Sequence, residues 1–95
     1  MKVVWTARAR NDLRAIARLI ARDNPTAALN LVRRIRTAVS RLADHPYMGR
    51  PGRVDNTREY VVSGTRFIVP YRVTDRRVDV LAVVHEARAW PDTFQ

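Results

Sequence analysis

The sequence contains no cysteine, so disulfide bonds and thiolate chemistry play no part in this protein. Its two histidines, His45 and His85, lie far apart in the sequence and lack the spacing of zinc ligands. No P-loop, Rossmann glycine pattern or serine–histidine–aspartate order is present, and the acidic residues suggest no carboxylate pair. We therefore expect no metal site and no cofactor.

Long apolar runs are also missing, since none approaches the ~20 residues that a membrane-spanning helix needs. The first residues, Met1 to Trp5, run straight into charged positions and have no apolar segment of the kind found in signal peptides. The hydrophobic fraction of 46% is that of a folded domain rather than a disordered chain. We expect one small domain over residues 1–95, located in the cytoplasm.

Acidic residues are scarce: the 9 aspartates and glutamates face 18 basic residues, which leaves a net charge of +9. Such an excess predicts a polyanionic partner, either nucleic acid or an acidic protein. Lys2 is the only lysine. Arginine binds phosphate and carboxylate through two parallel hydrogen bonds, which suits either partner. A GC-rich genome explains the preference for arginine equally well, but it does not explain the size of the excess.

The first half of the chain has the pattern of a short strand followed by two helices. Lys2 to Trp5 reads as the strand, and residues ~6–44 read as an antiparallel helical hairpin. Thr6 and Asn24 are suitable N-caps, and Pro25 suits the first position of the second helix. Each helix carries one apolar stripe at helical spacing, made of Ala9, Leu13, Ile16 and Ile20 in the first and Ala28, Val32, Ile35, Val39 and Leu42 in the second.

The second half has the pattern of a loop and three strands. Residues 45–57 read as the loop, and the strands are expected at 58–63, 66–73 and 78–85. Pro70 lacks an amide donor, so its strand should be either an edge strand or bulged at that point. In the tail, Glu86 to Gln95, Trp90 and Phe94 are expected to cover the sheet.

The order β-α-α-β-β-β predicts an α+β fold in which the helical hairpin packs on one face of a mostly antiparallel sheet. The other face of the sheet would then be partly open, and we expect functional residues there.

Four arginines on the first helix follow one another at a spacing of four residues: Arg10, Arg14, Arg18 and Arg22. Like charges at this spacing repel each other by a few tenths of a kcal/mol per pair, and no acid lies within the stripe. The stripe is therefore either a docking strip for an acidic partner or a solvated helix face.

A second basic group lies in the loop and the strands that follow it. Arg50, Arg53 and Arg58, with Tyr47 nearby, form a mixture of arginine and aromatic side chains that suits phosphate contact and base stacking. Together with Arg72 they are our candidates for binding a nucleic acid or another target. The alternative is that the prolines and glycines of this segment only shape a connection.

Three further residues could perform catalysis. His85 could act as a general acid or base near neutral pH, and Arg66 and Arg88 could stabilise the charge on a phosphate during metal-free RNA cleavage through the 2′-hydroxyl. The alternative for His85 is a histidine at a strand end, bonded to the backbone.

Several segments, taken in order, resemble toxins of the RelE/ParE family, and the match spans nearly the whole chain. These segments are Val4-Trp5-Thr6-x-x-Ala9, Asp12-Leu13, His45-Pro46-Tyr47-Met48-Gly49-Arg50-Pro51-Gly52-Arg53-Val54, Thr57-Arg58-Glu59, Ile68-Val69-x-Tyr71-Arg72-Val73 and Val80-Leu81-x-Val83-x-His85-x-x-Arg88.

The resemblance implies a single RelE/ParE-like domain that is the toxin of a type II toxin–antitoxin system. It also implies a cognate antitoxin whose acidic, partly disordered segment folds onto the toxin. RelE-like members cut mRNA on the ribosome, whereas ParE-like members poison DNA gyrase and are not nucleases. The paired strand lysines of RelE are absent here, and the His-Pro-x-Met-Gly loop favours the ParE-like side. The alternative is a RelE-like endoribonuclease that uses His85, Arg66 and Arg88.

Overall fold

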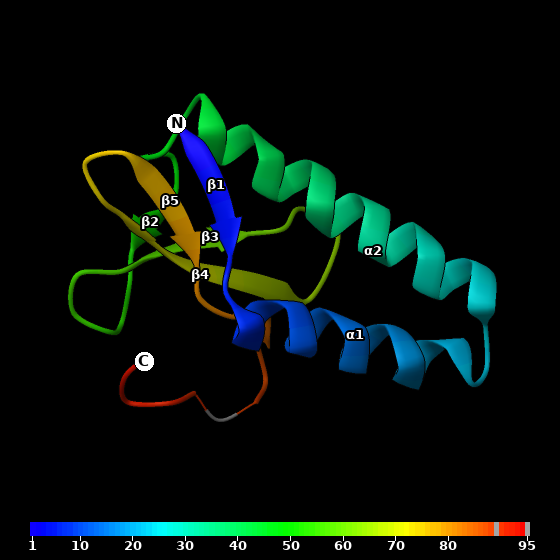
Figure 1. Cartoon of the computed structure of the whole chain (residues 1–95). Helices are drawn as coiled ribbons and strands as arrows, with labels where there is room; N and C mark the ends of the chain where they lie inside the picture. Colours follow the sequence, from blue (N-terminus) through cyan, green and yellow to red (C-terminus); the bar gives the residue numbers. More distant parts are fainter. Residues whose placement is uncertain (89, 95) are drawn as a thin grey trace.

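A helical hairpin lies over one face of a mostly antiparallel β-sheet, which confirms the predicted α+β class (Figure 1). The structure is a computed structural model that describes residues 1–88 and 90–94, so Ala89 and Gln95 of the predicted tail lie outside the described residues. Its elements are β1 (Lys2–Trp5), α1 (Ala7–Ala21), α2 (Pro25–Ser40), the 3-10 turn η1 (Arg41–Ala43), β2 (Arg50–Pro51), β3 (Arg58–Val61), β4 (Phe67–Val73), β5 (Arg77–Val80) and β6 (Val84–His85). No helix among these residues is long and apolar enough to cross a membrane.

Both predicted N-caps start their helices. The Thr6 hydroxyl accepts a hydrogen bond from the Ala9 amide (3.2 Å) and donates one to the Val80 carbonyl (2.8 Å), so it also ties the start of α1 to β5. The Asn24 side chain accepts from the Ala27 amide (3.0 Å), and Pro25 occupies the first turn of α2. Both caps satisfy amides that have no partner within the helix.

The strands run in the order β1-β5-β4-β3-β2, and β6 pairs with β4 beyond the end of β5. Among the strands of the described residues, β1 and β5 form the one parallel pair. Since β4 lies between β5 and β3, Pro70 is in a central strand, which excludes the edge position, the first of the two alternatives expected for it.

The strand expected over 78–85 is divided into β5 and β6 opposite Pro70, as the alternative of a bulge predicts. The Leu81 amide donates to the Pro70 carbonyl (2.9 Å), so the missing amide of Pro70 faces this same segment. Regular pairing cannot continue there because one donor is absent. The Val83 amide turns instead to the Asp12 carboxylate of α1 (3.0 Å). The predicted loop 45–57 also differs, since it contains the short strand β2.

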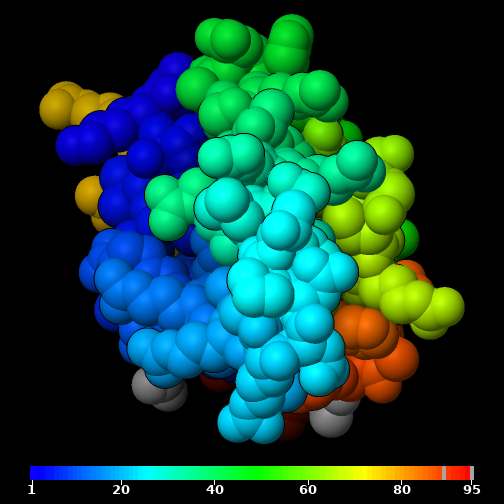
Figure 2. Space-filling model, turned by 90° about the vertical axis from the view of Figure 1, so that its right-hand side faces the viewer, coloured from blue at the N-terminus to red at the C-terminus, as the bar shows by residue number. Residues whose placement is uncertain are grey.

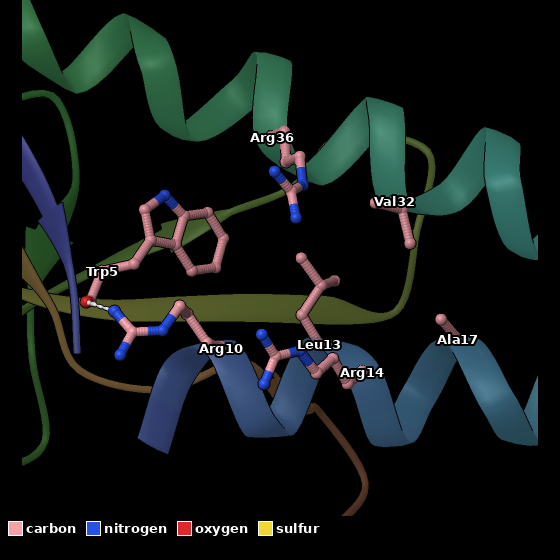
Figure 3. A pocket seen from close by; sticks show the side chains of 7 residues that line it. All are labelled: Trp5, Arg10, Leu13, Arg14, Ala17, Val32 and Arg36. Carbon is pink, nitrogen blue, oxygen red and sulfur yellow. Dashed lines mark hydrogen bonds between the residues drawn. The ribbon is translucent and has the colours of Figure 1, made fainter. Parts of the chain in front are cut away.

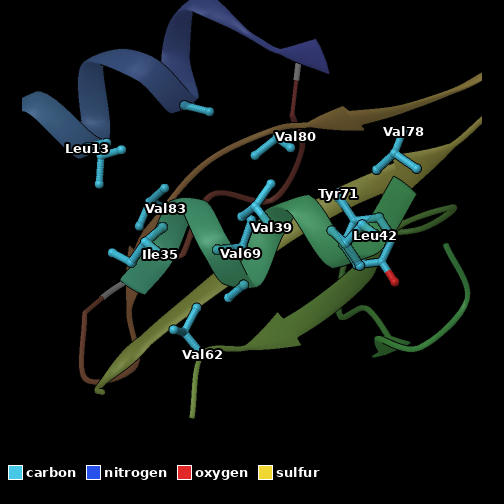
Figure 4. Close-up of a cluster of buried hydrophobic side chains, with 12 residues drawn as sticks. Leu13, Ile35, Val39, Leu42, Val62, Val69, Tyr71, Val78, Val80 and Val83 are labelled. Atoms are coloured by element: carbon cyan, nitrogen blue, oxygen red, sulfur yellow. The ribbon is translucent and has the colours of Figure 1, made fainter. Parts of the chain in front are cut away.

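The main core lies between the hairpin and the sheet (Figure 4). In the close-up, Ile35 and Val39 of α2 and Leu42 of η1 meet Val69 and Tyr71 of β4, and all five are buried. A smaller cluster joins the tail to the rest of the protein, as expected for Trp90 and Phe94, and consists of Val54, Leu81, Ala82 and Phe94 with Val84 and Trp90 at its border. The tail therefore covers part of the structure that the helices leave free.

Candidate functional site

A groove of about 960 Å³ runs between α1 and the strands β4 and β6. Figure 2 views the end of the molecule where the hairpin tip (cyan), the β3–β4 turn (yellow-green) and residues 85–88 (orange) meet. Apolar side chains line much of the groove: Ile16, Leu19, Ile20, Leu31, Phe67, Val83 and Val84. Five arginines also line it: Arg8, Arg18, Arg22, Arg66 and Arg88. Among the described lining residues the one acid is Asp12, which already bonds the Val83 amide.

The three residues predicted to be catalytic, Arg66, His85 and Arg88, all line this groove. His85 is held by its neighbours: its Nδ1 accepts a hydrogen bond from the Ala87 amide (3.1 Å), and its ring stands edge-on to Phe67 at 5.4 Å between centroids. Arg66 lies 3.7 Å from the Glu86 carboxylate, with both side chains exposed. The geometry leaves Nε2 of His85 as the nitrogen that could transfer a proton.

The predicted arginine stripe of α1 is divided between two places. Arg18 and Arg22 line the groove, whereas Arg10 and Arg14 line a smaller pocket between α1 and α2. Four residues exceed one helical turn by about 40°, so the stripe winds through about 120° between its two ends. A single flat partner surface therefore cannot contact all four arginines equally.

A second basic surface surrounds Glu59, whose side chain is only 3% exposed. Its carboxylate accepts hydrogen bonds from Arg50 Nη2 (3.0 Å), the Arg53 amide (2.8 Å) and Arg53 Nε (3.3 Å). Burial alone would raise the pKa of Glu59, but these hydrogen bonds and the two guanidinium charges outweigh burial and hold the pKa below its ordinary value of 4.5. Glu59 therefore stays charged at neutral pH and fixes both arginines in place.

The remaining candidates for target binding border the same loop from two sides. Arg72 donates a hydrogen bond from Nε to the Asn56 carbonyl (3.3 Å). Glu59 of β3 pairs with Pro70 of β4, and Arg72 lies two residues after Pro70. Because alternate residues of a strand lie on the same face, Arg72 is on the sheet face of Glu59. Arg58 lies on the opposite face because it pairs with the core residue Tyr71.

The Arg58 side chain contacts the loop that precedes β2. It donates to the Gly49 carbonyl (2.8 Å), and its guanidinium lies 5.1 Å from the Tyr47 ring centroid. The structure thus brings Arg50, Arg53 and Arg72 to one face and leaves Arg58 on the other.

Sequence reasoning missed three polar anchors: Glu59, Asp12 and Tyr71. The Tyr71 hydroxyl accepts from the Gly49 amide (2.9 Å) and donates to the Pro46 carbonyl (2.8 Å), and burial raises its pKa above 10.0. Its position in an alternating strand next to a loop rich in proline and glycine was the available signal. For Glu59 the signal was an acid between two arginine-rich segments.

The family model described as ParE toxin of type II toxin-antitoxin system, parDE, matches residues 3–90. The chain belongs to the ParE toxin family. This confirms the RelE/ParE resemblance: the protein is the toxin of a type II toxin–antitoxin system, and its partner is an antitoxin.

Individual relatives agree with this assignment. The toxin is 44% identical to the protein Y4kP of Sinorhizobium fredii over 93 residues, which cover 98% of this chain and 96% of Y4kP. It is 38% identical to Toxin RelE2 of Caulobacter vibrioides over 87 residues, covering 92% of this chain and 97% of that protein. A chain of the chromosomal ParDE TA system from P. aeruginosa superposes with a TM-score of 0.82 at 28% identity, covering 90% of this toxin and 95% of that chain.

Proposed function

We propose that the toxin stops growth by binding DNA gyrase, as ParE-like toxins do, and not by cutting mRNA. This proposal rests on the contacts that the residues predicted to be catalytic make with their neighbours. His85 is engaged through Nδ1 with the Ala87 amide and through its ring with Phe67, and Arg66 lies beside Glu86. These contacts suit a histidine that anchors the end of a strand. The family match over residues 3–90 supports the same choice.

We assign contact with gyrase to the surface around Glu59. Arg50 and Arg53 are about half exposed although Glu59 fixes them, so their guanidiniums can still bind an acidic partner or DNA. Arg53 also stacks on the Trp90 ring at 3.7 Å from its centroid, which further limits its motion. Arg72 extends the same face. Arginine side chains that are already fixed before the partner binds lose less conformational entropy on binding.

We assign antitoxin binding to the groove between α1 and β6. Its apolar lining with arginines around it suits an acidic, amphipathic segment that is disordered when free and folds as it binds. Leu19 is 54% exposed in the toxin alone and would be covered by such a segment. Arg18 and Arg22 would pair with its carboxylates, whereas Arg10 and Arg14 would take part only if the segment continued across α1.

The direct test adds purified toxin to a DNA gyrase supercoiling reaction and, in parallel, to ribosomes translating a defined mRNA. We expect inhibition of gyrase and intact mRNA. Toxin carrying His85→Ala should inhibit gyrase to the same extent as the unaltered toxin. Toxin carrying both Arg50→Glu and Arg72→Glu should inhibit gyrase at least tenfold less. Equal inhibition by the double variant would remove the surface around Glu59 from the proposal.

One observation favours a second candidate, a RelE-like mRNA endonuclease: Arg66, His85 and Arg88 line one groove. In that reaction His85 Nε2 would take the proton from the 2′-hydroxyl, and the 2′-oxygen would attack the adjacent phosphate to form a 2′,3′-cyclic phosphate. The bond from phosphorus to the 5′-oxygen would break, the 5′-oxygen would leave with a proton from solvent, and the arginines would offset the phosphate charge. Cleavage of ribosome-bound mRNA that disappears in His85→Ala would establish this alternative. An antitoxin segment in the same groove would block the site.

A further inference from the structure

A pocket of about 210 Å³ lies between the two helices, on a different side of α1 from the groove. Trp5 at the end of β1, Arg10 and Arg14 of α1 and Arg36 of α2 line it, with Leu13, Ala17 and Val32 as its apolar part. Figure 3 shows the Trp5 indole between the helices, with Arg36 reaching down from α2 and the side chains of Arg10 and Arg14 extending along α1 toward Trp5. Three cationic side chains from two helices thus meet beside one aromatic ring.

The positive charge of this pocket is not balanced within it. No acidic side chain is among its described lining residues. The Arg10 guanidinium donates to the Trp5 carbonyl (2.7 Å), while the side chains of Arg14 and Arg36 make no hydrogen bond or ion pair within residues 1–88 and 90–94. Arg10 and Arg14 are one helical turn apart, a spacing at which like charges repel. An anion bound between the guanidiniums would relieve this repulsion and fill their free donor positions.

The rest of the pocket selects the kind of anion. Trp5 is partly buried and packs against the main core with part of its surface, while another part of the indole borders the pocket. An indole beside apolar side chains can stack on a flat heterocycle, and aromatic–base stacking is a general way to bind nucleotides. A pocket of about 210 Å³ has the size for a small molecule rather than for a polymer.

We propose that this pocket binds a free mononucleotide, with the base against Trp5 and the phosphate between Arg14 and Arg36. The site is separate from the groove and from the surface around Glu59, so the inference does not depend on which target the toxin attacks.

The test is calorimetric titration of purified toxin with AMP, adenosine and inorganic phosphate. We expect AMP to bind at least tenfold more tightly than adenosine or phosphate, because only AMP offers both the ring and the anion. The affinity should fall with added salt. In a Trp90→Phe background, AMP should also change the fluorescence of the remaining Trp5.

Substitutions of the arginines that line the pocket test whether the nucleotide binds there. Arg14→Gln combined with Arg36→Gln should lower AMP affinity at least tenfold, the usual effect of losing a charge-assisted hydrogen bond. The matched control is Arg33→Gln with Arg76→Gln, which removes the same charge from exposed positions outside the pocket and should change affinity less than twofold. Unchanged circular dichroism and melting temperature would verify that all variants fold.

Several results would overturn the proposal. Binding of AMP no tighter than phosphate would reduce the pocket to an anion site without base recognition. An equal loss in both double variants would mean that net charge, not the pocket, attracts the nucleotide. Affinity that rises steadily with the length of a 5′-phosphorylated oligonucleotide would assign binding to a longer surface, and the absence of saturation at millimolar AMP would eliminate the site.

Discussion

The buried carboxylate of Glu59 should stabilise the toxin in a pH-dependent way, and Glu59→Gln measures its effect. This substitution keeps the shape of the side chain but removes its charge and turns one acceptor oxygen into a donor. Two ion pairs to half-exposed arginines are weakened, each contributing about 0.5 kcal/mol after solvent screening. The Arg53 amide, which is 2.8 Å from the carboxylate, loses a charged acceptor at a cost of about 1 kcal/mol. The sum is about 2 kcal/mol at pH 7.

The effect should disappear in acid. Because the pKa of Glu59 is lowered by folding, the unfolded chain binds a proton at a higher pH than the folded chain does. The stabilisation is therefore fully present above the ordinary pKa of 4.5 and is lost as the pH falls through the lower, folded-state pKa. Below that pKa the unaltered toxin also carries a neutral side chain, so its free energy of unfolding should approach that of Glu59→Gln.

Urea denaturation followed by circular dichroism at pH 7, 5 and 3 tests both points. Asp79→Asn is the matched control: it removes a carboxylate 2.7 Å from the Arg77 guanidinium, in a pair with no further partners among the described residues. We expect that control to cost less than about 1 kcal/mol. Glu59 does not have this stabilising role if Glu59→Gln costs no more than Asp79→Asn at pH 7, or if the loss of stability in Glu59→Gln is as large at pH 3 as at pH 7.

Three further predictions concern the other anchors and the groove. Asp12→Ala should lower the free energy of unfolding by about 2 kcal/mol because the Val83 amide loses its acceptor, and Asp12→Asn, which keeps an acceptor oxygen, should cost less than half of that in the same urea assay. Tyr71→Phe should cost about 1–3 kcal/mol and increase proteolysis of the 45–52 loop, and unchanged cleavage would mean that the hydroxyl does not hold the loop. Replacing Arg18 and Arg22 by Glu should weaken antitoxin binding at least tenfold and reduce the dependence of the affinity on salt concentration. An unchanged affinity would mean that both arginines only form a solvated helix face.

The parts of the fold that the sequence predicts well are those fixed by neighbouring residues. Thr6 and Asn24 cap their helices through amides three residues away, and the apolar stripes follow directly from the helical period. The family resemblance was also accurate because it rests on several segments in a fixed order.

The parts that escaped prediction depend on contacts between distant segments. The division of the last strand requires knowing that Pro70 faces residues 81–83 and that Asp12 can take over the Val83 amide. Strand β2 has only two residues and forms because β3 offers it a partner. The arginines of the Glu59 surface could be listed from sequence, but the carboxylate that fixes Arg50 and Arg53 could not be chosen before the register of β2 and β3 was known.

We propose that this ParE-family toxin acts on DNA gyrase. The most direct measurement expresses the toxin alone, with its antitoxin under separate control, and follows chromosome integrity and mRNA in the same cells. We expect double-strand breaks and an SOS response with uncut mRNA, and the same result for toxin carrying His85→Ala and Arg88→Ala. Rapid cleavage of ribosome-bound mRNA with intact chromosomes, abolished by those two substitutions, would contradict action on gyrase.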